Sequence, residues 1–328
     1  MTFFSTIPGA LILLVVGFVF LIKGADFFVE GASAVAKKLH VPALVIGMTI
    51  VAMGTSLPEL SVSVTASLAN SNQLAIGNVI GSNIFNLMVV LGSCALFSAL
   101  EVADDTIKKD FPFSVACAVA LMIMGLFGSS VGHLDGAILL VAFVIFLGSM
   151  LMAAKKHRTT AAEIAEEEAE KEIVDIPTWL CIVYIIGGAV AIKFGGDWVV
   201  DSCTTLALKF GMSETLVGLT IVALGTSLPE LVTSIVAAKK NELDMAIGNV
   251  VGSNIFNILL ILGVAGAISP MTYLTVNAID TLILVAFSAV VWLMCLKKKN
   301  LNKGNGIIML VLYALYLGYI IVRDGGLA

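Results

Sequence analysis

The chain has 328 residues, of which 59% are hydrophobic and only 12% are charged, with a net charge of −5. Its mean hydropathy is +1.06. Soluble domains carry about 25% charged side chains, so this composition excludes a soluble enzyme, a nucleic-acid-binding protein and a disordered scaffold. It predicts a polytopic membrane protein whose surroundings are the lipid bilayer.

Ten segments are long and apolar enough to cross a bilayer, which takes about 20 apolar residues. In chain order they are 7–36, 43–69, 74–99, 112–128, 134–153, 178–208, 214–238, 243–268, 276–296 and 306–322. The expected organisation is a first half of five spans in residues 1–153, a charged, partly helical cytoplasmic linker in 154–177, and a second half of five spans in 178–328. The predicted fold class is an all-α polytopic membrane protein with ten transmembrane helices.

The basic residues predict the orientation, because Lys and Arg collect in cytoplasmic loops. With the N-terminus outside, all but four of the 18 Lys and Arg residues fall on the inner side; the exceptions are Lys23 and Lys193 within spans, and Lys209 and Arg323 outside. We therefore expect a multi-pass protein of a prokaryotic cell (inner) membrane, with both termini outside.

An internal repeat is the most informative feature of the sequence. Residues 47–60, GMTIVAMGTSLPEL, recur at 218–231 as GLTIVALGTSLPEL, with 12 of 14 positions identical. Residues 75–86, AIGNVIGSNIFN, recur at 246–257 as AIGNVVGSNIFN, with 11 of 12 identical. Both matches are displaced by 171 residues. Because each half has an odd number of spans, the second copy enters the membrane from the opposite side, which predicts inverted-topology repeats.

Two glutamates, Glu59 and Glu230, occupy matching positions in the middle of the second and seventh spans. A carboxylate at that depth costs about 2.5 to 3.5 kcal/mol on insertion scales, and the sequence offers no equally central Lys or Arg to pair with either one. We interpret the pair as a shared cation site.

A proline precedes each glutamate, at Pro58 and Pro229. Proline has no N–H to donate to the carbonyl four residues earlier, so the carbonyls of Gly54 and Gly225 are expected to be free where the two helices break. A simple proline kink is the alternative, and it leaves the neighbouring glutamate unexplained.

Hydroxyl and amide side chains repeat around the glutamates and are the further candidate ligands. They are Thr55, Ser56, Ser82 and Asn86 in the first half, and Thr226, Ser227, Ser253 and Asn257 in the second. Spacings of three and four residues place such side chains on one helix face. A hydroxyl bonded back to its own helix and close helix packing through GxxxG pairs are the alternatives for these positions.

A site of carboxylate, hydroxyl, amide and backbone oxygens suits hard cations such as Ca²⁺ and Na⁺. Two negative charges are balanced by one Ca²⁺ or by two Na⁺, whereas the empty site leaves two bare carboxylates in the membrane. The loaded forms are therefore expected to cross more readily than the empty form, which couples the movement of one ion to that of the other.

The motifs GTSLPE and GNxxGSNIFN resemble the paired alpha-repeats of the calcium/sodium antiporters of the Ca²⁺/cation exchanger superfamily. The resemblance implies a secondary transporter and not an enzyme, with Ca²⁺ and Na⁺ as transported substrates and no resident cofactor. It implies Glu59 and Glu230 as central ligands, and backbone carbonyls of Ala52 and Ala223 as further ligands. It also implies electrogenic exchange and a sliding gate formed by the first and sixth spans.

Asn86 and Asn257 depart from some prokaryotic relatives, which carry Asp at one of these two positions; this leaves the ion stoichiometry open. A Ca²⁺/H⁺ exchanger is the main alternative function, although that branch resembles GNxxE-type repeats. A passive cation channel and an intramembrane hydrolase are weaker alternatives.

Acidic side chains follow one another by four residues in the first span, at Asp26 and Glu30, and in the sixth, at Asp197 and Asp201. Lys23 and Lys193 lie within a turn of Asp26 and Asp197. We expect ion-paired or water-exposed helix ends here; an ion-attracting vestibule is the alternative.

Overall fold

The computed structural model describes residues 6–165, 176–211 and 223–323, and nearly all of this part of the chain is helical. Eight helices within these ranges are long and apolar enough to cross a membrane, and a bent pair, residues 43–55 and 57–68, makes up to nine. The chain is thus a multi-pass membrane protein. The predicted seventh span, 214–238, begins at residues that the structure does not describe, so the predicted count of ten is not tested.

The first half consists of helices that fall close to the predicted spans. Its elements are α1 (Ile7–Leu39), α2 (Ala43–Ile46), the π-helical segment η2 (Gly47–Val51), α3 (Ala52–Thr55), α4 (Leu57–Leu68), α5 (Asn72–Phe85), η3 (Asn86–Val90), α6 (Leu91–Phe97), β1 (Leu100–Glu101), η4 (Thr106–Asp110), α7 (Phe111–Gly128), β2 (Ser130–Val131) and α8 (His133–Ala165). Helix α8 continues well beyond residue 153 into the predicted linker.

The second half repeats this order. Its elements are α9 (Thr178–Lys209), α11 (Ala223–Gly225), α12 (Leu228–Lys239), α13 (Leu243–Phe256), η6 (Asn257–Ile261), α14 (Leu262–Ile268), β3 (Met271–Thr272), α15 (Thr275–Lys298), β4 (Asn300–Leu301) and α16 (Lys303–Arg323). Strand β1 pairs with β4 and β2 with β3, both antiparallel. These short pairings between the halves are absent from the all-helical prediction.

Backbone conformation repeats with the sequence. The starts of α5 and α13, of η3 and η6, and of β1 and β3 are each 171 residues apart. Left-handed residues also recur in matching turns, as His40 and Gly211 after the first helix of each half, and as Asn70 and Asn241 before α5 and α13. Asn and Gly adopt this conformation at low cost. The turn between α4 and α5 therefore has the same left-handed residue as the turn between α12 and α13.

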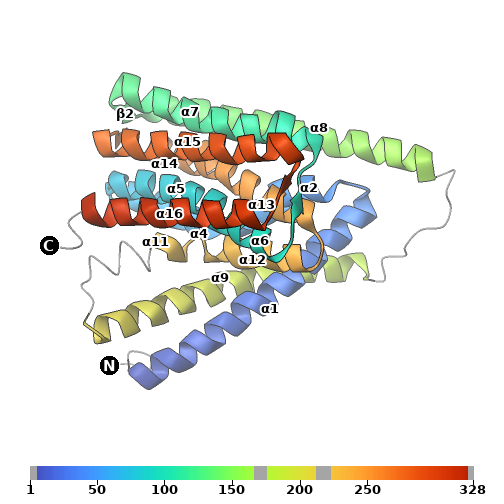
Figure 1. Cartoon of the computed structure of the whole chain (residues 1–328), viewed down its shortest axis with the longest axis horizontal. Coiled ribbons are helices and arrows are strands. Elements are labelled where there is room, and N and C mark those ends of the chain that lie inside the picture. Colours follow the sequence, from blue (N-terminus) through green and yellow to red (C-terminus); the bar gives the residue numbers. More distant parts are fainter. Residues whose placement is uncertain (1–5, 166–175, 212–222, 324–328) are drawn as a thin grey trace.

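Glycines bring α1 and α9 together as an antiparallel pair along one edge of the molecule (Figure 1). A Cβ added at Gly17 would lie 3.0 Å from the carbonyl of Gly195, and one added at Gly24 would lie 3.0 Å from the carbonyl of Gly188. At Gly31 the added atom would lie 2.9 Å from the carbonyl of Cys181. The three α1 glycines are seven residues apart, so they form one stripe along which the two backbones are in contact.

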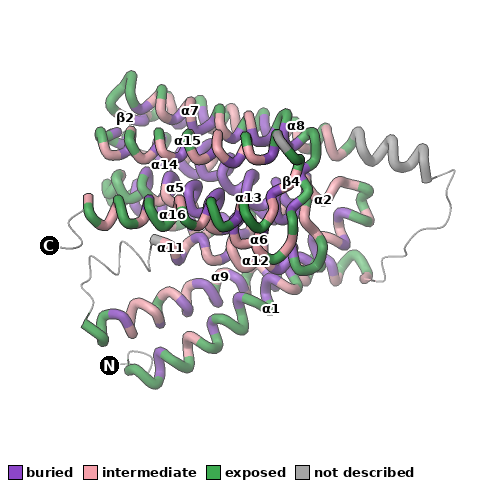
Figure 2. Tube along the Cα trace, viewed as in Figure 1, coloured by how far each residue is buried: buried purple, intermediate pink, exposed green. Residues whose placement is uncertain are grey.

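The core lies around α5 and α13. In the spans Asn72–Phe97 and Leu243–Ile268, 78% of the most apolar window is buried, against 28% in α1 and α9. Figure 2 shows the same arrangement, with buried segments at α5, α13 and α14 and exposed outer faces on α7, α8, α15 and α16. The broken helices α3–α4 and α11–α12 pack against this core, and the glutamates beside the two breaks are fully buried.

We expect Gly188→Leu to destabilise the protein and Gly187→Leu to have little effect. A Cβ at Gly188 would lie 2.7 Å from the Gly24 carbonyl, whereas nothing lies within 4 Å of one at Gly187. Overpacking of this kind costs about 1 to 3 kcal/mol. Thermal unfolding midpoints of the two detergent-purified variants provide the measurement, and equal midpoints would contradict the close contact between α1 and α9.

Candidate cation site

The helix breaks are local consequences of the GTSLPE motifs. Ser56 (φ −84°, ψ 8°) ends α3 and precedes α4, and the axis bends by 49° between the two helices. Ser227 (φ −94°, ψ 5°) holds the same position before α12. In both motifs proline is the second residue of the new helix, where its missing N–H is tolerated. Each glutamate is thereby placed in the first turn of a helix.

The predicted break glycines, Gly54 and Gly225, have a packing role. An added Cβ at Gly54 would lie 2.7 Å from the ring of Phe28 on α1, and one at Gly225 would meet the side chain of Val200 on α9. Helix α1 therefore contacts the first break and α9 contacts the second. A shift of either helix would displace the segment that precedes a glutamate.

The carboxylates of Glu59 and Glu230 are fully buried and face each other's half of the molecule. Ser56 donates a hydrogen bond of 2.9 Å to Oε1 of Glu230, and Ser227 donates one of 3.0 Å to Oε1 of Glu59. The predicted pair is thus brought together, and the two breaks lie against each other in the centre.

The second oxygen of each carboxylate, Oε2, is buried without a hydrogen-bond partner. The two acids are also close enough to repel one another. In the ranges that the structure describes, neither Glu59 nor Glu230 forms an ion pair with a basic side chain. Two unneutralised carboxylates in a dry core are very unfavourable, so this arrangement suits a bound cation.

The second motif adds oxygens from α5 and α13. The hydroxyl of Ser82 lies 3.0 Å from that of Ser227, and the hydroxyl of Ser253 is buried without a hydrogen-bond partner. Asn257 uses its amide nitrogen on Asn83 at 2.9 Å, which leaves its Oδ1 without a partner. Both amide atoms of Asn86 are buried and unpartnered.

The threonines of the motifs are held by two asparagines that the sequence interpretation missed. The Thr55 hydroxyl lies 3.1 Å from Oδ1 of Asn249, and the Thr226 hydroxyl lies 3.4 Å from Oδ1 of Asn78. Asn78 also donates to Ser63 at 3.0 Å, as Asn249 does to its counterpart Ser234 at 2.9 Å. The available signal was the shared displacement of 171 residues between Asn78 and Asn249.

A second missed pair joins the two core helices. Asn83 donates to the carbonyl of Asn254 at 3.1 Å, and Asn254 donates to the carbonyl of Asn83 at 3.2 Å. Both residues are buried. This reciprocal contact fixes α5 against α13 and so fixes the distance between the oxygens that the two helices carry.

The backbone positions implied by the resemblance are only partly described. The carbonyl of Ala52 accepts the Ser56 N–H at 3.0 Å and lies 3.3 Å from the Thr55 hydroxyl. In the second half, the Ser227 N–H bonds to the Leu224 carbonyl at 3.3 Å.

A cleft of about 390 Å³ reaches the second break from one side of the molecule. It is lined by Pro58, Ser61 and Val62 of α4, by Lys193, Gly196, Asp197, Val200 and Asp201 of α9, and by Gly225, Thr226 and Pro229 of the second break. The predicted ion pairs are confirmed, with Lys193–Asp197 at 2.6 Å and Lys23–Asp26 at 3.4 Å. Because Asp197 and Asp201 also line the cleft, its mouth is acidic.

The acceptor atoms that meet around the two glutamates are carboxylate, hydroxyl and amide oxygens. No cluster of three or more His, Cys, Asp or Glu side chains occurs in the described parts of the chain, so the central charge comes from the two glutamates. Ca²⁺ takes about 6 to 8 oxygen ligands in a flexible shell, whereas Zn²⁺ prefers nitrogen and sulfur. The arrangement can hold a hard cation.

Comparison with known proteins places the chain in a family. The model of the sodium/calcium exchanger protein family matches residues 9–152 and 180–322. The chain is 39% identical over 311 residues to the putative antiporter CaxA of Alkalimonas amylolytica, covering 94% of this chain and 97% of that protein. It is 30% identical to the sodium/calcium exchanger MaX1 of Methanosarcina acetivorans, covering 93% and 97% of the two chains.

Solved structures agree with the sequence relatives. The sodium-calcium exchanger NCX_Mj, soaked with Na⁺ and Ca²⁺, superposes with a TM-score of 0.81 at 30% identity, covering 94% of this chain and 97% of that chain. The match spans both halves and the central helices that carry the glutamates. The chain therefore belongs to the sodium/calcium exchanger protein family, a family of ion exchangers and not of enzymes.

Proposed function

We propose that the protein is a secondary active antiporter that exchanges Na⁺ for Ca²⁺ by alternating access to the site of Glu59 and Glu230. One observation carries the proposal: two fully buried carboxylates meet at the centre, each with an unpartnered oxygen. The names of the similar proteins, which include sodium/calcium exchangers, support the choice of ions.

The proposed ligands are the oxygens that the two motifs bring to the centre. They are Glu59, Glu230, Thr55, Ser56, Thr226, Ser227, Ser82, Ser253, Asn86 and Asn257, with the carbonyls of Ala52 and Ala223. Their unpartnered acceptors, on both glutamates, Asn86, Ser253 and Asn257, are those that a cation would satisfy. One Ca²⁺ or two Na⁺ neutralise the two charges, which makes either load compatible with a closed site.

We further propose ten spans arranged as two inverted repeats. The crossed Ser–Glu bonds, the antiparallel α1–α9 contact and the β1–β4 and β2–β3 pairs each map onto themselves or onto one another when the halves are exchanged. A twofold relation of this kind is how inverted-repeat transporters build a midplane site. The basic loops favour a prokaryotic inner membrane with both termini outside.

Alternating access is supported by a difference between the two sides of the site. On the α9 side lies the acidic cleft. On the α1 side, Lys240 in the α12–α13 turn lies 3.5 Å from Oε2 of Glu30 and donates a 3.0 Å bond to the carbonyl of Asp26. Ser33 of α1 also donates to Glu242 in the same turn.

These contacts belong to one copy of the repeat only. The residues 171 positions before Lys240 and Glu242 are Ala69 and Ser71, which carry no charge. We therefore assign the structure to a state that is open beside α9 and held closed beside α1 by Lys240. Opening on the α1 side requires these contacts to break.

We expect Glu59→Gln and Glu230→Gln each to lower Na⁺-driven Ca²⁺ uptake by more than about 100-fold, equivalent to about 2.7 kcal/mol. The amide removes one of the two charges that hold Ca²⁺. Uptake of radioactive Ca²⁺ into everted vesicles, with a Na⁺ gradient imposed and the proton gradient collapsed, is the measurement. The exposed Glu101→Gln is the matched control.

The same assay separates the alternatives. Wild-type uptake that needs a proton gradient and ignores Na⁺ indicates a Ca²⁺/H⁺ exchanger, and uptake without any counter-ion indicates a passive channel. Uptake near the wild-type rate in either glutamine variant, with normal insertion, would rule out the proposed site.

We expect Lys240→Gln to shift the protein toward the state open beside α1, whereas Lys239→Gln should not. Lys239 is adjacent but packs over the Phe97 ring, 5.1 Å from its centre. A partly exposed ion pair contributes about 0.2 to 1 kcal/mol, so the ratio of the two states should change by a factor of about 1.4 to 5. A cysteine at Val232, the counterpart of the cleft residue Ser61, reports on the α1 side.

The readout is the rate at which a membrane-impermeant maleimide labels that cysteine in everted vesicles, above the labelling of the parent chain. Faster labelling in Lys240→Gln than in Lys239→Gln is expected. Equal rates in the two variants would mean that Lys240 does not hold the α1 side closed.

A further inference from the structure

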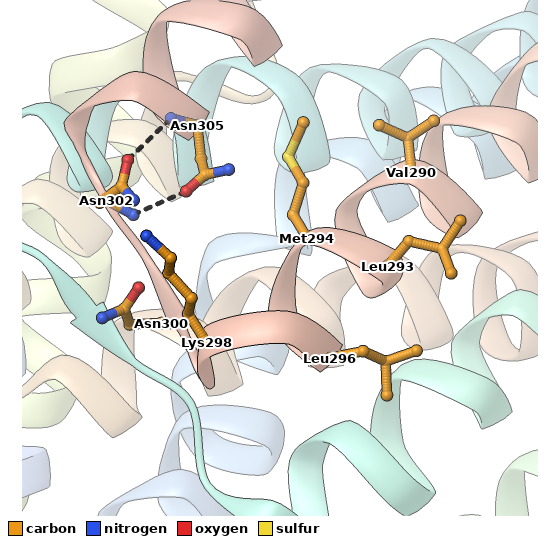
Figure 3. A pocket seen from close by; sticks show the side chains of 8 residues that line it. All are labelled: Val290, Leu293, Met294, Leu296, Lys298, Asn300, Asn302 and Asn305. Carbon is orange, nitrogen blue, oxygen red and sulfur yellow. Dashed lines mark hydrogen bonds between the residues drawn. The ribbon is translucent and has the colours of Figure 1, made fainter.

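A large pocket lies away from the cation site, where α15 ends and α16 begins (Figure 3). Its volume is about 750 Å³. Val290, Leu293, Met294 and Leu296 form an apolar part, and Lys298, Asn300, Asn302 and Asn305 form a polar part. The pocket thus has an apolar end and a polar end.

The polar end presents hydrogen-bond donors beside one buried acceptor without a partner, Oδ1 of Asn300. Oδ1 of Asn302 accepts the N–H groups of Gly304 and Asn305 at 2.9 and 3.2 Å, and Oδ1 of Asn305 accepts the N–H of Asn302 at 3.1 Å. Because both side-chain carbonyls are used in capping α16, the amide nitrogens are the groups left for a ligand. The Lys298 side chain extends toward these asparagines in Figure 3.

Lys298 is also the positive charge of this pocket. Its neighbour Lys299 pairs with Asp104 at 2.7 Å and lowers the pKa of that carboxyl. Lys298, in contrast, forms no ion pair with a carboxylate of the described residues. An ammonium and two amide donors at one end of a pocket recognise a phosphate-type anion.

The apolar end faces the lipid side of the molecule. Leu293 and Leu296 on α15 are 58% and 49% exposed, and α15 and α16 are peripheral helices with exposed outer faces (Figure 2). In a membrane such a surface contacts acyl chains. A ligand that fits the whole pocket therefore has an anionic head and a hydrocarbon tail.

The first half of the chain has the same local fold without these groups. The α7–β2–α8 corner repeats the α15–β4–α16 corner, and the N–H of Gly132 bonds Asp135 at 2.8 Å as that of Asn302 bonds Asn305. There Gly128 ends α7 where Lys298 ends α15, and the acidic Asp135 replaces Asn305. The fold does not require the lysine or the second asparagine, so their presence calls for another reason.

We propose that this pocket binds one anionic phospholipid, with its phosphate on Lys298 and the amides of Asn302 and Asn305 and an acyl chain along Leu293 and Leu296. The lysines at the end of α15 place the headgroup at the level of the membrane interface. With the orientation proposed above, this is the cytoplasmic leaflet. A bound lipid would join α15 to α16 at the corner that β4 also forms.

The test uses the full chain in nanodiscs of phosphatidylcholine, with or without phosphatidylglycerol. Phosphatidylglycerol is expected to raise the thermal unfolding midpoint of the wild type and to be retained by it in native mass spectrometry. Lys298→Gln should reduce the retained phosphatidylglycerol several-fold, and Lys298→Arg should restore it. The control Lys38→Gln removes one charge in the last turn of α1, a helix that contributes no residue to the pocket lining, and should behave as wild type.

Equal retention of phosphatidylglycerol by wild type and Lys298→Gln, or equal retention of phosphatidylcholine and phosphatidylglycerol by the wild type, would overturn the proposal. The unfolding midpoint in phosphatidylcholine alone shows whether each variant is folded. Because no ion gradient is applied, the result does not depend on whether the protein exchanges Na⁺ for Ca²⁺.

Discussion

The mutual repulsion of two buried carboxylates is the constraint on which the rest of the structure depends. Glu59 and Glu230 meet in a dry core where no described basic side chain neutralises them. Each accepts one hydroxyl from the other half of the molecule, so the charges are held together by serines of opposite repeats. Desolvated charges of this kind are stable only with a counter-charge. In the function proposed above, that counter-charge is a mobile cation.

Much of this could be predicted from the sequence because the informative residues are repeated. Two motifs, each present twice at one displacement, mark the core helices α5 and α13 and the two breaks that pack against them, as far as the structure describes these segments. Proline beside glutamate predicts a broken helix with a carboxylate at the break. A break and an unpaired carboxylate are each costly in a membrane, so their occurrence together indicates a binding site. The spans within the described residues follow from hydropathy alone, and their ends shift by a few residues except at α8, which continues to Ala165.

The contacts between the halves could not be predicted from the sequence in the same way. A motif gives spacing along one helix, whereas Asn83 and Asn254 meet only once α5 and α13 have a fixed rotation and height. The same holds for Asn78 and Asn249, which bond the threonines of the opposite break. Positions of this kind depend on packing of the whole bundle.

Comparison of the two repeats distinguishes the residues that are proposed to bind the ion, which occur in both halves, from residues that occur in one half only. The central motifs are almost identical in the two halves, as the proposed alternating access requires of a site that faces either side in turn. The differences lie at helix ends, where Lys240 and Lys298 have no charged counterpart of the same sign in the first half. An exchanger with two equivalent halves would have two access states of equal free energy in a symmetric environment. Under the proposed mechanism, residues present in one copy alone set the preference between the states, and the membrane leaflet that contacts them is part of that balance.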